Sequence, residues 1–219
     1  MFSVIFDMDG TLLDTQQICI PAWEHGGAMQ GIKGVGEHIY NVCGMNETGW
    51  TGYLESHFPT LDVQIFKRDV RAYIAENGVI RLKKGALELL DFLKCNNVKM
   101  AVASGSSTKS ITHHLNEVGV FDYFGAFAGS HDVENGKPAP DVFLLAAKRL
   151  GVAPEDCFVF EDSANGIKAG FAAGMKCIGV PDIAEFESDI KAIMFAELKS
   201  LDEAIELFKA YGMRKDMIL

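Results

Sequence analysis

Residues 3–15 read Ser3-Val4-Ile5-Phe6-Asp7-Met8-Asp9-Gly10-Thr11-Leu12-Leu13-Asp14-Thr15, and this stretch guides the interpretation of the whole chain. It begins with a short apolar run that ends in two acidic residues and a glycine. An apolar run of this kind is typical of a parallel strand that is buried on both faces. We therefore expect a buried strand here, with Asp7, Asp9 and Gly10 at its carboxyl end.

Further apolar runs follow at residues 98–103, 126–128, 157–160 and 176–180. The segments between them carry apolar residues at helical spacing, at residues 86–93, 110–118, 141–150 and 164–173. Strands that alternate with helices of this length indicate a doubly wound parallel sheet. We predict an α/β protein with a Rossmann-like core.

Residues 15–81 interrupt this alternation. They contain glycine-rich stretches and helical patterns but no convincing buried strand. We predict that residues 1–14 and 82–219 form the α/β catalytic core and that residues 15–81 form an inserted all-helical cap. The chain would cross between the two parts near Thr15 and Arg81, which are therefore the expected hinges.

The composition narrows the classes of partner and compartment. Lysine and arginine total 20 against 30 acidic residues, which gives a formal charge of −10 in 219 residues. Such a charge repels nucleic-acid phosphates and anionic lipid headgroups, so we expect neither as a partner. No stretch reaches the ~18 uninterrupted apolar residues of a membrane helix. The five cysteines are scattered and form no CxxC pair, which favours reduced thiols in a cytoplasmic protein. We also expect a monomer, with a loosely held tail at residues 213–219.

Polar residues stand at the end of each long strand, where open α/β sheets bind ligands. Asp7 and Asp9, followed by Gly10, suit a hard cation beside a tight turn, although a lone pair of this kind is more often a solvated loop. Ser104 and Gly105 directly precede a helix, where hydroxyl and backbone N–H groups can bind an anion or simply cap the helix.

Two more strand ends add a lysine and two carboxylates. Lys137 is held between Gly136 and Pro138 and could neutralise a phosphoryl group or pair with a carboxylate. Glu161 and Asp162 are adjacent acids that repel each other unless a cation or a lysine offsets them. Each signal is weak alone, but four at one edge of a sheet indicate magnesium-assisted phosphoryl transfer.

The segment from Asp7 to Thr15, together with Ser104, Gly136-Lys137-Pro138 and Glu161-Asp162-Ser163, resembles the four ordered motifs of the haloacid dehalogenase-like superfamily. The order and spacing match along the whole chain. The most similar branch is that of the β-phosphoglucomutase-like phosphatases, which carry a helical cap after the first motif.

The resemblance implies a role for each motif residue. Asp7 would be the nucleophile that forms an aspartyl phosphate, and Asp9 would be the general acid and then the general base. Ser104, the Gly105 amide and Lys137 would bind the phosphoryl group. Mg²⁺ would be bound by Asp7, the Asp9 carbonyl and Asp162, with Glu161 in support.

The core motifs bind only the phosphate and cannot distinguish one organic leaving group from another. Discrimination between substrates is therefore expected to come from the cap. The candidate cap positions are Cys19, Trp23, Asn46 and Trp50. Packing inside the cap is the favoured interpretation of Trp23, and contact with the substrate is its alternative.

We predict a Mg²⁺-dependent phosphatase that acts on a small phosphorylated metabolite such as a sugar phosphate. A phosphosugar mutase is the alternative, but Cys19 stands where the mutases are expected to have a histidine, and Asn46 stands in place of a cap arginine. A catalytically silent binding protein on the same fold is a minor alternative, since every motif residue is present. A dehalogenase is disfavoured because it has no need of the magnesium carboxylates.

Overall fold

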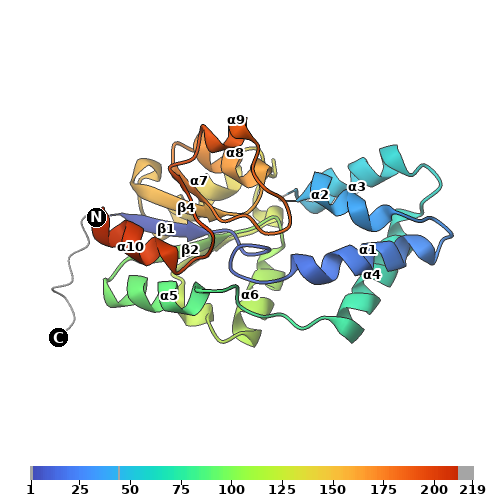
Figure 1. Ribbon diagram of the computed structural model, residues 1–219, viewed down its shortest axis with the longest axis horizontal. Helices are drawn as coiled ribbons and strands as arrows, with labels where there is room; N and C mark the ends of the chain where they lie inside the picture. The colour runs from blue at the N-terminus through green and yellow to red at the C-terminus, as the bar shows by residue number, and fades with distance from the viewer. Residues whose placement is uncertain (1, 44, 212–219) are drawn as a thin grey trace.

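The computed structural model describes residues 2–43 and 45–211 and contains a parallel sheet with helices on both faces (Figure 1). The strand order is β3-β2-β1-β4-β5-β6, with every pair parallel. The strands are β1 (Ser3–Phe6), β2 (Lys99–Ala103), β3 (Ala126–Ala128), β4 (Cys157–Glu161), β5 (Lys176–Gly179) and β6 (Ala196–Glu197). The predicted doubly wound, Rossmann-like α/β core is confirmed.

The register of the central strands places the motif residues at one edge of the sheet. Phe6 on β1 lies opposite Val102 on β2 and Phe160 on β4. The residues that follow these positions therefore lie level with one another. This alignment brings Asp7 beside the ends of β2 and β4.

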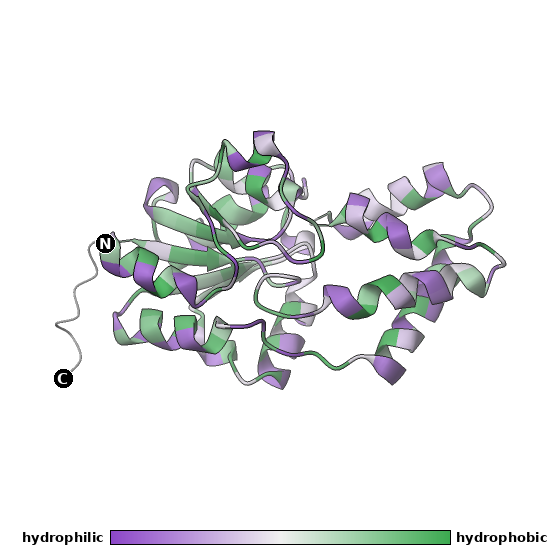
Figure 2. Ribbon diagram, in the orientation of Figure 1, coloured by the Kyte–Doolittle hydropathy of each residue, from purple (hydrophilic) through white to green (hydrophobic). Residues whose placement is uncertain are grey.

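Each face of the sheet is covered by its own apolar layer. One face packs against α5 (Ala86–Cys95), α6 (Thr108–Glu117) and α10 (Glu203–Ala210). The other packs against α7 (Asp141–Leu150), α8 (Ala164–Ala172) and α9 (Ser188–Lys191). Figure 2 shows the resulting pattern, with hydrophobic strands between helices that alternate hydrophobic and hydrophilic faces.

The insertion after the first strand consists of helices joined by loops, with no strand among its described residues. It consists of α1 (Gln16–Ala28), a 3₁₀ turn (Val35–His38), α2 (Ile39–Val42), α3 (Glu47–His57) and α4 (Val63–Asn77). These helices enclose a third apolar core that includes Trp23, Phe66 and Val70. Gly26 lets α1 and α4 approach closely, because a Cβ there would lie 2.8 Å from Val70 and 2.9 Å from Phe66. The insertion extends to one side of the sheet as a helical cap (Figure 1).

The chain enters and leaves the cap through two segments that lie side by side. The backbone N–H of Asp14 donates to the carbonyl of Arg81 at 2.9 Å, and that of Lys83 donates to the carbonyl of Leu12 at 2.8 Å. The two crossings are thus joined by main-chain hydrogen bonds, so any movement of the cap must bend both together.

Some elements differ from the prediction. The strand β6 was not expected, since it has only two residues and no apolar run. The helix α6 begins at Thr108 rather than at residue 110, because the hydroxyl of Ser107 accepts the N–H of Ser110 at 3.2 Å as its cap. None of the described helices is long and apolar enough to cross a membrane. The predicted tail at residues 213–219 lies outside the described residues.

Candidate active site

Lys137 is the centre of a buried cluster of charges. Its ammonium Nζ lies 2.5 Å from Oδ1 of Asp7 and 2.6 Å from Oε1 of Glu161. The side chains of Lys137 and Glu161 are completely buried, and that of Asp7 is 6% exposed. The other Glu161 oxygen, Oε2, accepts the backbone N–H and the hydroxyl of Ser163, both at 2.8 Å. One buried cation thus offsets two buried carboxylates, an arrangement in which removal of one partner is costly.

Burial also changes the proton affinity of these groups. It raises the pKa of Asp7 to about 8, although the nearby Lys137 charge acts in the opposite direction. For Lys137, burial favours the neutral amine, but the charges of Asp7 and Glu161 outweigh it and raise the pKa of the ammonium above its usual value. Such perturbed groups at a strand end are typical of a functional site.

The carboxylate of Asp9 is held by three hydroxyl groups. Oδ1 accepts from Thr15 at 2.9 Å, and Oδ2 accepts from Ser106 at 2.8 Å and from Ser104 at 3.3 Å. Thr15 belongs to the entry into the cap, whereas both serines follow β2 of the core. Asp9 therefore connects the core to the first cap helix.

Asp162 faces a polar cradle made by the first motif. Its Oδ1 accepts the hydroxyl of Thr11 at 3.0 Å, and its Oδ2 accepts the side-chain amide of Gln16 at 2.6 Å. The same Gln16 amide lies 3.3 Å from the carbonyl oxygen of Asp9. Burial raises the pKa of Asp162 well above its usual value, with further contributions from the Glu161 and Asp7 charges.

This cradle fits a small divalent cation. Gly10 has a φ of +86°, and a Cβ at that position would lie 2.4 Å from Oδ2 of Asp162 and 2.3 Å from Nε2 of Gln16. The available donors are carboxylate and carbonyl oxygens, which Mg²⁺ prefers. Among the described residues, no group of three or more His, Cys, Asp or Glu side chains is arranged as a metal site. A cation beside Asp162 would therefore need the main-chain carbonyl of Asp9 as well as side-chain carboxylates.

A cavity of about 380 Å³, here called the polar cavity, opens above Asp7. Its walls include Ser104, Gly105, Ser106, Ser107 and Ser110. Ser106 donates its backbone N–H to the hydroxyl of Ser104 at 2.9 Å, which fixes this loop ahead of α6. Hydroxyl and N–H groups before a helix N-terminus suit a phosphoryl group. Lys137 does not line the cavity and lies beneath it, in contact with Asp7.

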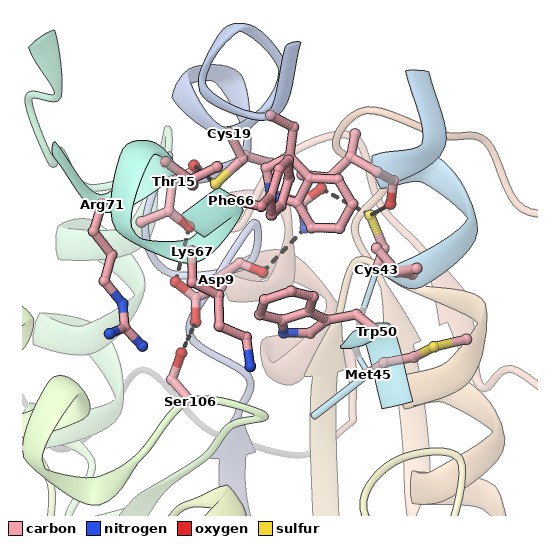
Figure 3. A pocket seen from close by; sticks show the side chains of 15 residues that line it. Asp9, Thr15, Cys19, Cys43, Met45, Trp50, Phe66, Lys67, Arg71 and Ser106 are labelled. Carbon is pink, nitrogen blue, oxygen red and sulfur yellow. Dashed lines mark hydrogen bonds between the residues drawn. The ribbon is translucent and has the colours of Figure 1, made fainter. Parts of the chain in front are cut away.

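A second cavity of about 290 Å³, here called the apolar cavity, lies against the cap (Figure 3). It shares six lining residues with the polar cavity: Asp9, Gln16, Met45, Trp50, Arg71 and Ser106. Its other walls are mostly apolar and are formed by Cys19, Trp23, Ile39, Val42, Cys43, Phe66 and Val70, with Thr15 and Lys67. The two cavities together form a space that extends from the core motifs into the cap.

Three of the four candidate cap residues line this space, namely Cys19, Trp23 and Trp50. Trp23 lines the apolar cavity and also packs inside the cap: it is only 7% exposed, and its ring lies against Phe66 with centroids 5.4 Å apart. Asn46 lines neither cavity. Its side chain instead caps α3 by accepting the N–H of Gly49 at 2.9 Å, and it packs against Gly136 in the core.

Several polar residues that face the site were not predicted from the sequence, among them Gln16, Lys67 and Arg71. Lys67 lies 2.8 Å from Glu47 and 5.0 Å from the ring centroid of Trp50. Arg71 lies one turn further along α4 and approaches Glu47 only to 3.9 Å. Both follow apolar residues that face the cap core, Phe66 and Val70, so the helical period of α4 was the available signal.

Comparison with known proteins gives the family directly. The family model described as haloacid dehalogenase-like hydrolase matches residues 3–174. The chain belongs to this family. All the motif residues described above lie within the matched range.

Relatives of known name agree. The chain is 34% identical over 183 residues to the fructose-1-phosphate phosphatase YqaB of Escherichia coli, a match that covers 81% of this chain and 95% of that protein. It is 31% identical over 190 residues to the β-phosphoglucomutase of Bacillus subtilis, with 82% and 83% covered. Among solved structures, CbbY of Rhodobacter sphaeroides in complex with phosphate superimposes with a TM-score of 0.74 at 26% identity, over 93% of this chain and 96% of that one. The predicted phosphoric monoester hydrolase of this superfamily is thereby confirmed.

Proposed function

We propose that the protein is a Mg²⁺-dependent phosphatase that hydrolyses a small phosphorylated metabolite through an aspartyl-phosphate intermediate on Asp7. The observation that carries the proposal is the position of Asp7: its carboxylate is buried at a strand end, pairs with Lys137 and borders a cavity lined with hydroxyl groups. A phosphoryl group bound among Ser104, Gly105 and Ser106 would lie within reach of that carboxylate.

In the first step, an Asp7 oxygen attacks phosphorus and the bond to the leaving oxygen breaks. Asp9 donates a proton to that oxygen, and in the second step it accepts a proton from the water that attacks the phosphoaspartate. The hydroxyl groups of Thr15, Ser104 and Ser106 fix the orientation of the Asp9 carboxylate. Lys137 keeps the buried pair Asp7 and Glu161 from repelling the incoming phosphate.

The residues that would hold Mg²⁺ are Asp7, the carbonyl of Asp9 and Asp162. When bound, the cation would offset the negative charge of the phosphoryl oxygens. Glu161 would support this site through Lys137 and Ser163, which are its contacts, rather than as a direct ligand. The side-chain amide of Gln16 contacts two of these oxygen groups and would have to release them.

We further propose the domain boundaries at residues 14/15 and 81/82, where the two crossings are hydrogen-bonded to each other. Movement about this pair would open and close the cap over Asp7. The names of the relatives favour a phosphate ester that contains a sugar, since one is a fructose-1-phosphate phosphatase, another is a β-phosphoglucomutase and a third is a probable pseudouridine-5′-phosphatase. The five cysteines are free, which suits a reducing cytoplasm, and we propose that the enzyme acts there as a monomer.

A mutase is the second candidate, and one observation favours it. The absence of a cap arginine near Asn46 argues against this activity, but Arg71 of α4 lines both cavities, and its weakly paired guanidinium could bind a second phosphate. Cys19, which lines the same cavity in place of the histidine expected of a mutase, still favours the phosphatase.

The test is a phosphate-release assay with acetyl phosphate, fructose 1-phosphate and β-glucose 1-phosphate, with Mg²⁺ and with EDTA. The proposal predicts Mg²⁺-dependent release of inorganic phosphate that disappears in Asp7→Asn. Conversion of β-glucose 1-phosphate to glucose 6-phosphate without free phosphate would identify the mutase instead.

A further inference from the structure

The apolar cavity has few polar groups that are free to bind a sugar. Gln16 donates to Asp162 and accepts from the thiol of Cys43 at 3.4 Å. The hydroxyl groups of Thr15 and Ser106 both donate to Asp9. Lys67 is paired with Glu47. Among the described charged residues of the lining, Arg71 is the one without a close partner, since its side chain is 73% exposed and approaches Glu47 only to 3.9 Å.

The walls away from Asp9 are instead aromatic and aliphatic. Trp23 and Trp50 lie with ring centroids 5.6 Å apart, and Phe66 packs edge-on against Trp23. Ile39, Val42 and Val70 complete this wall. Hydroxyl groups of a polyol placed against it would lose their water without gaining partners, which costs free energy for each group.

Trp50 is the aromatic residue most available to a ligand. Trp23 and Phe66 are nearly or completely buried in the cap core, whereas Trp50 is half-buried and borders both cavities. Figure 3 shows its indole close to Lys67, on the side of the cavity that faces Asp9. A flat ring can cover such an indole face and remove it from water, with a favourable stacking energy.

The polar and aromatic parts of the space are continuous and differ in chemistry. The polar cavity, which contains Asp7, Asp9 and the serines after β2, would hold the phosphoryl group and its ester oxygen. Trp50 borders both cavities and so connects this region to the apolar walls. Building on the function proposed above, we propose that the leaving group carries a flat aromatic ring, as in a nucleoside monophosphate. The phosphate and its adjoining carbon would occupy the polar cavity, and the ring would enter the apolar cavity beside Trp50.

A matched pair of substrates tests this directly. Adenosine or uridine 5′-monophosphate and ribose 5-phosphate share the phosphate and the 5′-oxygen and differ in the base. We expect kcat/KM for a nucleotide to exceed that for ribose 5-phosphate by at least about fivefold, because stacking of a base on an aromatic side chain is worth that much. Equal values for both nucleotides and ribose 5-phosphate would overturn the proposal.

Variants locate the effect. Trp50→Leu is expected to reduce the nucleotide-to-ribose ratio of kcat/KM towards one, and Trp50→Phe, which keeps a flat ring, is expected to retain most of it. Phe171→Leu is the control, since Phe171 is an exposed aromatic on α8 that lines neither cavity. A ratio that survives in Trp50→Leu would contradict the assignment of the ring to this cavity.

Binding without turnover separates this inference from the proposed function. The chain contains only two tryptophans, Trp23 and Trp50, and both line the apolar cavity, so its intrinsic fluorescence reports on this place. Saturable quenching by adenosine or uridine, but not by ribose, is expected in the wild type and should be reduced in Trp50→Phe. No hydrolysis of acetyl phosphate would refute the phosphatase, whereas acetyl phosphate hydrolysis with no ring preference and no quenching would refute only the ring.

Discussion

The side-chain amide of Gln16 lies 2.6 Å from Oδ2 of Asp162 and 3.3 Å from the carbonyl oxygen of Asp9. Both of these oxygen atoms can only accept hydrogen bonds, so the NH₂ group of Gln16 must face them. It therefore interacts with the same oxygen groups that we assign to Mg²⁺. Gln16 also begins α1 of the cap, which links the proposed metal site to the helix that forms one wall of the apolar cavity.

The first prediction follows from this contact. Gln16→Ala removes a competitor for Asp162, so Mg²⁺ should bind more tightly, by roughly 10- to 100-fold, as expected from the loss of one hydrogen bond to a charged group. Isothermal titration calorimetry of the protein with Mg²⁺ measures the affinity. Gln17→Ala, an exposed neighbour on the same helix, is the matched control and should leave it unchanged. Weaker binding in Gln16→Ala would show that Gln16 helps to hold the cation.

The second prediction concerns the nucleophile. Asp7→Asn keeps the shape of the side chain but cannot attack phosphorus, so turnover should be lost while the circular dichroism spectrum is retained. Lys137 keeps its contact with Glu161 at 2.6 Å, so the buried ammonium still has a carboxylate partner in this variant. A folded Asp7→Asn protein with activity within about tenfold of the wild type would exclude Asp7 as the nucleophile.

The third prediction concerns proton transfer by Asp9. Asp9→Asn keeps the main-chain carbonyl and should lower kcat by roughly the 10²–10⁴ typical of general acid–base catalysis. The loss should be smaller for p-nitrophenyl phosphate than for an alkyl phosphate, because nitrophenolate departs without protonation. Equal losses for the two substrates would argue against the role as an acid.

The fourth prediction concerns the metal. EDTA should abolish turnover, Mg²⁺ should restore it and Ca²⁺ should inhibit, since Ca²⁺ prefers more ligands at longer distances and would disturb the approach of Asp7 to phosphorus. The readout is phosphate release after dialysis against each ion. Full activity in EDTA or with Ca²⁺ alone would be incompatible with the site described above.

The fifth prediction separates stability from specificity in the cap. Asn46 caps α3 and lines neither cavity, so Asn46→Ala should lower the free energy of unfolding by about 1 kcal/mol. It should leave the ratio of kcat/KM between two substrates unchanged. Urea unfolding gives the first quantity, and a change in substrate ratio comparable with that of Trp50→Leu would restore Asn46 as a specificity residue.

The core was predictable because its signals are local. Each long strand is an apolar run, and the register of β1, β2 and β4 follows from their order, so Asp7, Ser104 and Glu161 could be expected at one edge. The strand β6 was not predictable, since two residues at a sheet edge leave no pattern.

The cap side of the site was less accessible to sequence reasoning. Gln16, Lys67 and Arg71 reach the cavities only because α1 and α4 pack together and place those faces towards the core. Their helical positions could be read from the sequence, but the orientation of the cap could not. Asn46 lines neither cavity and its side chain caps α3, so its expected contact with a substrate stays a prediction.

Reduction of the protein with borohydride during turnover tests the central claim most directly. An acyl phosphate on Asp7 would be reduced by borohydride, which converts that residue to homoserine, and mass spectrometry of the N-terminal peptide locates the change. The account predicts homoserine at position 7 only when substrate and Mg²⁺ are both present, and none in Asp7→Asn. Rapid phosphate release without any modified Asp7, or with homoserine at another acidic residue, would contradict it.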